Sequence, residues 1–210
     1  MAEPATTGDP AAETRRVPLV LVHGLWDTPR LFRSLQAELG ERRQPQLVPH
    51  LPHGLGWTPL RQLAEQLGSE IDAAYGREQP LDLLGFSMGG VIARVWIQLL
   101  GGWTRTRRFI SVASPHGGSL MALPWPRQLL AGVADMKPGS PLLRQLDTDL
   151  EPLRRIECCS FYCPVDLTVV PGWTAVLPVG PRHALPGLRH DRLLADPACL
   201  EPVVRELLRA

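Results

Sequence analysis

Ser87 is the residue whose surroundings most clearly indicate chemistry. It lies in Gly-Phe-Ser-Met-Gly-Gly at residues 85–90, between an apolar run and a stretch with helical periodicity. A turn this tight leaves no room for side chains two residues either side of the serine, which accounts for Gly85 and Gly89. It would expose the serine hydroxyl and direct a helix N-terminus at it. The pattern is typical of a serine nucleophile, and the alternative is a small-residue turn whose serine only caps the helix.

A serine nucleophile needs a base that accepts its proton. In this kind of turn the acid and then the base follow the serine along the chain. His190 stands in a loop that leads into the last predicted helix, and we predict that it is the base. His183 is the alternative, since a short final strand could run through residues 182–186.

The acid that orients the base is predicted to be Asp166, directly after the strand expected at residues 156–163. The alternative role is a turn aspartate bonded to its own backbone. The other aspartates are less well placed as the acid. No clear strand precedes Asp135, Asp147 or Asp149. Asp191 adjoins the histidine, and Asp82 begins a strand.

Two backbone N–H groups should hold the oxyanion that forms during such a reaction. We expect them at Met88, immediately after the serine, and at Leu25, in the loop after the first strand. His23, in the same loop, is expected to pack the loop. The side chains near the end of the next strand are expected to bond turns of the backbone; these are Ser114, His116 and Ser119.

Apolar strands alternate with helical segments along the chain and would position these residues. Strands are expected at residues 17–22, 46–48, 81–86, 109–113 and 156–163. Thr28-Pro29 and Thr58-Pro59 resemble helix N-caps, Met88 opens a helix to about Leu100, and Asp196-Pro197 opens the last one. This order predicts an α/β fold: a doubly wound, mostly parallel sheet with helices on both faces. Ligands of such sheets bind at the carboxyl ends of the strands, where the residues above fall.

The expected organisation is a disordered tail at residues 1–16 and a single domain at residues 17–210. Residues 120–150 are expected to form a small, mostly fixed cap or flap, because prolines interrupt any long helix there. Within it, short helices are expected from Gln128 to about Val133 and near Leu142–Leu146.

Composition limits the classes of partner. The 22 Lys and Arg residues nearly balance the 21 Asp and Glu residues, so a nucleic-acid-binding protein is not expected. The N-terminal residues have no apolar core of a secretion signal, and no apolar run is long enough to span a bilayer. We therefore expect a cytoplasmic monomer without stable membrane insertion. The four cysteines are expected to be buried and reduced, and no metal site or cofactor motif is evident.

Taken together, the chain resembles the α/β-hydrolase superfamily, and within it the compact bacterial serine lipases and esterases. The resemblance covers residues 17–209 and rests on five pieces in order: Val-His-Gly-Leu at 22–25, residues 85–90, Ser-Pro-His-Gly-Gly-Ser at 114–119, Asp166 with Val-Val-Pro at 169–171, and Gly187 with His190. It implies an ester hydrolase that acts through an acyl-enzyme, with Ser87, Asp166 and His190 as the catalytic triad and Leu25 and Met88 as oxyanion donors. Arg189 departs from the small residue that many relatives have before the base.

The substrate is expected to be a small-molecule or lipid ester with an apolar acyl group. Several aromatic and apolar residues fall in loops at the predicted site, and we expect Trp26, Met121 and Trp125 to contact the substrate. The alternatives are a catalytically silent binding or scaffold protein on the same fold, and an acyltransferase or thioesterase that uses the same triad.

Overall fold

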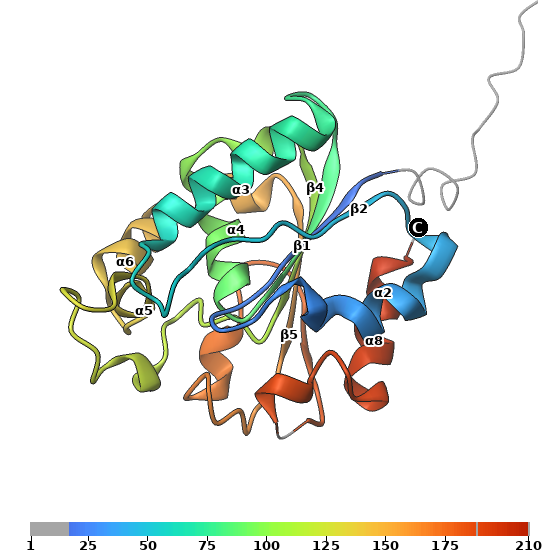
Figure 1. The fold of residues 1–210 in the computed structure, drawn as a ribbon. Coiled ribbons are helices and arrows are strands. Elements are labelled where there is room, and N and C mark those ends of the chain that lie inside the picture. The colour runs from blue at the N-terminus through green and yellow to red at the C-terminus, as the bar shows by residue number, and fades with distance from the viewer. Residues whose placement is uncertain (1–16, 188, 210) are drawn as a thin grey trace, which may run out of the picture.

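The computed structural model describes residues 17–187 and 189–209 (Figure 1). The tail predicted at residues 1–16 therefore lies outside the described residues. Six strands of the described part form one sheet in the order β2-β1-β3-β4-β5-β6, and every neighbouring pair is parallel. The strands are β1 (Leu19–Val22), β2 (Gln46–Leu47), β3 (Leu81–Phe86), β4 (Thr106–Val112), β5 (Glu157–Tyr162) and β6 (Arg182–Ala184). The predicted doubly wound sheet is confirmed, and it is wholly parallel.

Helices cover both faces of this sheet. The α-helices are α2 (Arg33–Leu39), α3 (Leu60–Tyr75), α4 (Met88–Leu99), α5 (Ala131–Asp135), α6 (Pro141–Thr148), α7 (Glu151–Arg154) and α8 (Pro197–Leu207). Short 3₁₀ turns join them: η1 (Pro29–Phe32), η2 (Gly40–Arg42), η3 (Gly102–Thr104), η4 (Leu120–Ala122), η5 (Gly172–Ala175) and η6 (His190–Arg192).

The strands are apolar on both sides because each face meets its own helix layer. On one face, Val20, Leu83 and Phe109 pack with buried residues of α3, α4 and α6. On the other face, Leu21, Leu84 and Ile110 pack with α2 and α8. Figure 1 shows α3 on one side of the sheet and α2 and α8 on the other. Because successive side chains of a strand point to opposite faces of the sheet, each apolar run contributes to both cores.

The two predicted threonine caps are wrong. Thr28 makes no side-chain capping bond, and the chain after it forms η1 before α2 begins at Arg33. Thr58 donates its hydroxyl to the Pro52 carbonyl, and the Leu60 N–H at the start of α3 instead donates to Asp135 Oδ2 at 3.0 Å. A residue far along the chain therefore supplies the hydrogen bond that a local cap was expected to make.

The segment at residues 120–150 follows β4 and forms η4, α5 and α6. The helix predicted over residues 128–133 is displaced, since α5 begins at Ala131, whereas the helix predicted near residues 142–146 is present as α6. Buried apolar side chains attach α5 and α6 to the core. The Arg94 guanidinium of α4, itself fully buried, donates to Asp147 at 2.8 Å and to the Leu146 carbonyl at 3.1 Å.

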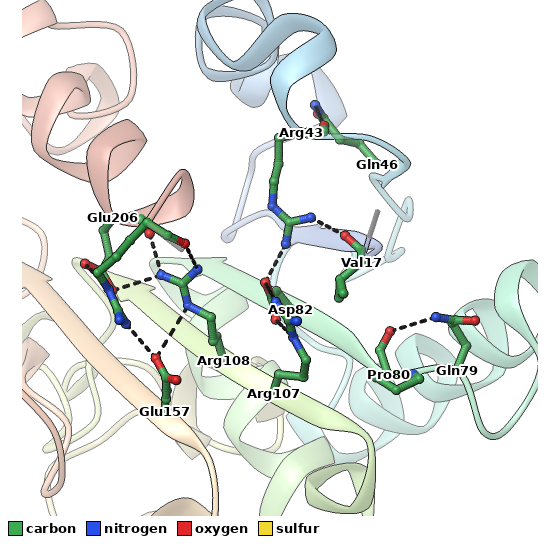
Figure 2. Close-up of polar contacts among 11 residues, drawn as sticks. Val17, Arg43, Gln46, Gln79, Pro80, Asp82, Arg107, Arg108, Glu157 and Glu206 are labelled. Atoms are coloured by element: carbon green, nitrogen blue, oxygen red, sulfur yellow. Dashed lines mark hydrogen bonds and ion pairs between the residues drawn. The ribbon is translucent and has the colours of Figure 1, made fainter. Parts of the chain in front are cut away.

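The amino end of the sheet carries a network of ion pairs (Figure 2). Asp82, at the start of β3, is buried between Arg43 at 2.5 Å and Arg107 at 3.2 Å. Arg108 pairs with Glu206 of α8 at 3.1 Å. Asp82 is therefore at the opposite end of its strand from Ser87, as its position in the sequence predicts.

The cysteines are Cys158, Cys159, Cys163 and Cys199, and all four are buried and free. Burial raises the pKa of the Cys158 and Cys159 thiols to about 12, so they remain uncharged. None of the helices in the described part of the chain is long and apolar enough to cross a bilayer.

Candidate active site

Ser87 occupies a sharp turn between β3 and α4. Its φ of 53° and ψ of −129° lie in a region that costs a residue with a side chain about 1–3 kcal/mol. Its N–H donates to the Val112 carbonyl of the neighbouring strand at 2.9 Å, which holds the turn against the sheet. Such strain persists only where the surroundings enforce it, so this serine is held in a conformation that it would not adopt by itself.

Close backbone approaches account for the glycines around the turn. A Cβ at Gly85 would lie 2.4 Å from the Gly90 Cα, and a Cβ at Gly89 would lie 2.1 Å from the Val22 carbonyl oxygen. Both are far inside van der Waals contact, and both partners are backbone. The first glycine lets the helix fold back on the strand, and the second lets the start of α4 rest against the end of β1.

The loop after β1 passes directly over the serine. A Cβ at Gly24 would stand 2.8 Å from the Ser87 Cβ, so only a glycine allows this crossing. The next residue, Leu25, lines the cavity that Ser87 also lines. Met88 is the first residue of α4, and the first N–H groups of a helix have no partner within it. The two predicted oxyanion donors therefore lie on the two backbone segments that flank Ser87.

His23 stands behind this loop as a buried, neutral ring. Its Nδ1 lies 3.1 Å from the Gly24 carbonyl oxygen, and its Nε2 accepts the Leu51 N–H at 3.3 Å. Burial lowers the pKa of His23, and nearby His53 and His50 lower it further against the opposing Gly24 hydrogen bond. The ring holds the loop in place, in agreement with the packing role predicted for it.

His190 and Asp166 are hydrogen-bonded. The His190 Nδ1 lies 2.7 Å from the Asp166 Oδ2, and the ring rests on Phe86 with 4.9 Å between ring centres. The other nitrogen, Nε2, is buried and has no hydrogen-bond partner among the described residues. His190 and Ser87 line the same cavity. The arrangement leaves one imidazole nitrogen bound to a carboxylate and the other unengaged near the serine.

The Asp166 carboxylate is held in its ionised form. Burial alone would raise its pKa, but the hydrogen bond and charge of His190 and the N–H groups of Val169 and Thr168 outweigh burial. The pKa of Asp166 consequently lies below its ordinary value. A carboxylate that stays charged in a buried place is suited to hold an imidazole and to stabilise its protonated form.

The alternative candidates are engaged elsewhere. His183 lies on the exposed strand β6 and stacks on Phe161. Asp191 pairs with Arg189 at 2.8 Å, and Asp149 accepts the Glu151 N–H at 2.9 Å on the surface. Asp135 and Asp147 attach the flap, as described above. The structure thus brings together His190 and Asp166 and none of these alternatives.

Ser114 and Ser119, after β4, bond the backbone as predicted, whereas the ring of His116 bonds a side chain instead. Ser114 donates to the Val112 carbonyl at 3.2 Å, and a Cβ at Gly90 would lie 2.0 Å from its Oγ. Ser119 accepts the N–H groups of Met121 and Val170. His116 is buried, with its Nε2 2.7 Å from the Ser111 Oγ.

A cavity of about 550 Å³ opens beside Ser87 and His190. It lies at the carboxyl end of the sheet, between the loops after β1, β4 and β5. All three residues predicted to contact substrate line it: Trp26, Met121 and Trp125. The flap contributes further apolar side chains, namely Ala122, Leu130, Val133 and Met136, and the loop after β5 adds Leu167 and Val169.

Sequence comparison decides the family. A family model described as the alpha/beta hydrolase family matches residues 19–209. The chain belongs to the alpha/beta hydrolase family. No curated protein matches this chain.

Solved structures share the fold of this chain at low identity. A Bacillus licheniformis lipase in its mature form has a TM-score of 0.71 at 17% identity, over 99% of this chain and 96% of that one. A thioesterase of the prodiginine pathway of Streptomyces coelicolor has a TM-score of 0.61 at 22% identity, over 99% and 90%. A Bacillus anthracis bromoperoxidase has a TM-score of 0.67 at 14% identity, over 92% of each chain. The neighbours therefore fix the fold, and they differ in their named activities.

Sequence reasoning missed Asp27 as a polar residue of the cavity. Arg189 and Asp191, which are named in the sequence analysis, also line it. A signal for Asp27 was present, since it follows Leu25 and Trp26 in the loop predicted to supply an oxyanion donor. This signal places Asp27 in the loop but not beside Ser87, because nothing in a single sequence indicates that Gly24 brings the loop against the serine.

Proposed function

We propose that this hydrolase is a serine carboxylic-ester hydrolase that acts through an acyl-enzyme. The observation that carries the proposal is the placement of Ser87 and the unengaged Nε2 of His190 on one cavity, with Asp166 bonded to the other ring nitrogen. A nucleophile, a base and an orienting acid are the parts that acyl transfer to serine requires.

In the proposed first half-reaction, the Ser87 Oγ attacks the ester carbonyl carbon while its proton passes to the His190 Nε2. The backbone N–H groups of Leu25 and Met88 hold the resulting oxyanion. The bond to the alcohol oxygen then breaks, and the alcohol leaves with the proton from His190. In the second half-reaction, water attacks the acyl-enzyme, gives its proton to His190, and releases the acid as Ser87 regains its proton.

The apolar cavity supports an ester with an apolar acyl group, either a small molecule or a lipid. Trp26, Met121 and Trp125 are the side chains proposed to contact it, because they line the cavity from two different loops. We also propose that the protein works as a monomer in the cytoplasm, and the four free, buried cysteines favour a reducing compartment.

The test is labelling by a fluorophosphonate probe together with hydrolysis of p-nitrophenyl butyrate. The wild-type protein is expected to label and to hydrolyse the ester, and Ser87→Ala is expected to lose both. Ser69→Ala is the matched control, because Ser69 lies exposed on α3 and donates only to the Glu65 carbonyl. A folded wild-type protein that does not label would indicate the silent scaffold instead. Product analysis with added alcohols and thiols separates hydrolysis from acyl transfer.

A further inference from the structure

Asp27 places a second carboxylate beside the proposed nucleophile. A Cβ at Gly24 would stand 2.9 Å from the Asp27 Oδ2 and 3.3 Å from the Ser87 Oγ. The carboxylate and the hydroxyl therefore flank the same point from different segments. Asp27 is half-buried and lines the cavity that Ser87 and His190 line. The reaction described above gives this carboxylate no role.

The carboxylate of Asp27 has no side-chain partner in the described part of the chain. Among residues 17–187 and 189–209, no side chain donates a hydrogen bond to its carboxylate or forms an ion pair with it. The other carboxylates nearby are matched, since Asp191 pairs with Arg189 and Asp166 with His190. Burial raises the pKa of Asp27, and the charge of Asp191 raises it further. The charges of His190 and His53 and a hydrogen bond from the Gly24 backbone oppose this rise. Among the described residues that line the cavity, Asp27 thus adds one carboxylate without an ion-pair partner to mostly apolar side chains.

We propose that Asp27 determines the charge specificity of the site, so that it accepts esters with neutral or cationic acyl groups and disfavours those that carry a carboxylate. The inference rests on the proposed function and names its substrate class more closely. Two charges a few ångströms apart in a partly desolvated cavity interact much more strongly than in water. One such charge is expected to change the relative rates of oppositely charged esters by about tenfold or more. The same repulsion would speed release of the acid product.

The experiment compares three p-nitrophenyl esters of one chain length: the neutral hexanoate, the monoester of adipic acid, and 6-(trimethylammonio)hexanoate. For each variant, kcat/KM of the charged esters is divided by that of the neutral ester, so that a general loss of activity cancels. In Asp27→Asn the ratio for the anionic ester is expected to rise about tenfold and the ratio for the cationic ester to fall. Asp27→Glu keeps the charge and is expected to keep the order of preference.

A binding measurement gives a readout that does not depend on turnover of the charged esters. Inhibition of neutral-ester hydrolysis by hexanoate is expected to strengthen in Asp27→Asn, and inhibition by hexyltrimethylammonium to weaken. Glu41→Gln removes the same charge from the exposed turn η2, at the end of the sheet away from the cavity, and is expected to change neither ratio.

The outcomes separate this inference from the proposed function. If the neutral ester is hydrolysed through Ser87, but the anionic-to-neutral and cationic-to-neutral ratios of kcat/KM are the same in wild type and Asp27→Asn, the charge role is wrong and the hydrolase remains. If Ser87→Ala retains hydrolysis of the neutral ester, the proposed function is wrong. A change in neutral-ester KM alone, with unchanged ratios, would give Asp27 a merely structural role and overturn the inference.

Discussion

Asp166 binds His190 with one carboxylate oxygen and the backbone with the other. Its Oδ2 lies 2.7 Å from the His190 Nδ1, while its Oδ1 accepts the Thr168 N–H at 2.7 Å and the Val169 N–H at 3.0 Å. The carboxylate cannot rotate without giving up one of these sets of bonds. It therefore fixes which imidazole nitrogen carries the proton and which remains to face the cavity.

Replacing Asp166 with Asn is expected to lower kcat for p-nitrophenyl butyrate by about 10⁴-fold. The amide keeps the size of the side chain and an acceptor for the two N–H groups. Its NH₂ group cannot accept from Nδ1–H and favours the wrong tautomer. The measurement is kcat beside a thermal unfolding midpoint. Asp149→Asn, which removes an exposed aspartate that sequence reasoning also weighed, should keep its rate. If Asp166→Asn kept the wild-type kcat and Asp149→Asn lost it, Asp166 would not be the acid.

Gly89→Ala is expected to destabilise the fold by about 3 kcal/mol and to abolish esterase activity. The added Cβ would lie 2.1 Å from the Val22 carbonyl oxygen and 2.6 Å from that of His23, so β1 and α4 would have to separate. The measurement is the free energy of unfolding in urea. Gly117→Ala is the control, since its Cβ would meet the Thr174 Cβ at 3.3 Å and should cost less than about 1 kcal/mol. Equal costs at the two positions would contradict the role given to Gly89.

The elements that a local pattern specifies were predictable, and contacts made across the chain were not. The apolar run that ends at Phe86 predicted a strand of the sheet. The two glycines around Ser87, followed along the chain by Asp166 and His190, predicted the residues that meet at the carboxyl end of the sheet. Thr58 satisfied the local rule for a cap, but Asp135, 75 residues away from Leu60, provides the bond. Tertiary contacts override local capping preferences because a helix N–H group is satisfied equally well by any acceptor that reaches it.

The buried His116 is expected to make the protein less stable in acid. Burial, aided by the charge of Arg94, lowers its pKa well below the ordinary 6.5. In the unfolded chain the ring takes up a proton below about pH 6.5, while in the folded protein it stays neutral. The contribution of His116 to the free energy of unfolding is thus fully present above about pH 6.5. It is lost as the pH falls toward the lower pKa of the folded state, by up to about 1.4 kcal/mol per pH unit.

The check is the free energy of unfolding in urea between pH 5 and 8 for wild type and His116→Asn. The variant loses packing and a ring contact to Ser111, so its stability at pH 8 is expected to be lower. The free energy of unfolding of the variant should depend less steeply on pH, by the contribution of about one proton, because asparagine does not titrate. Parallel slopes for the two proteins would show that His116 is not the group that links folding to protons.

Trp125 is expected to matter more for long acyl chains than for short ones. It lines the cavity from the flap, and we expect its ring to contact the part of the acyl chain beyond the carbonyl. Trp125→Ala should lower kcat/KM for p-nitrophenyl octanoate by about tenfold, and for the acetate by much less. Trp173→Ala is the matched control, because this tryptophan is 69% exposed and does not line the cavity. A uniform loss for both esters would place Trp125 outside the acyl site.

The flap at residues 120–150 is expected not to undergo a large opening motion. Soluble esters should therefore be hydrolysed without activation by a lipid–water interface. Val133, Leu143 and Leu146 are buried in the core that α3 and α4 also form. Arg94 of α4 binds Asp147 of α6, and Asp135 of α5 accepts the Leu60 N–H at the start of α3. A lid that opens would have to break these contacts together. It would expose the apolar side chains to water and would leave the Arg94 guanidinium without Asp147, which is costly where that charge stays buried.

The measurement follows the rate of hydrolysis of p-nitrophenyl butyrate or tributyrin as its concentration passes the solubility limit. The rate should rise hyperbolically and show no jump at that limit. Asp147→Asn supplies the comparison, because it removes the charge that pairs with Arg94 and loosens α6. If the wild-type rate rises sharply when substrate droplets form, the flap is a working lid and its anchors open in use. If only Asp147→Asn shows that rise, the Arg94–Asp147 pair is what holds the flap in place.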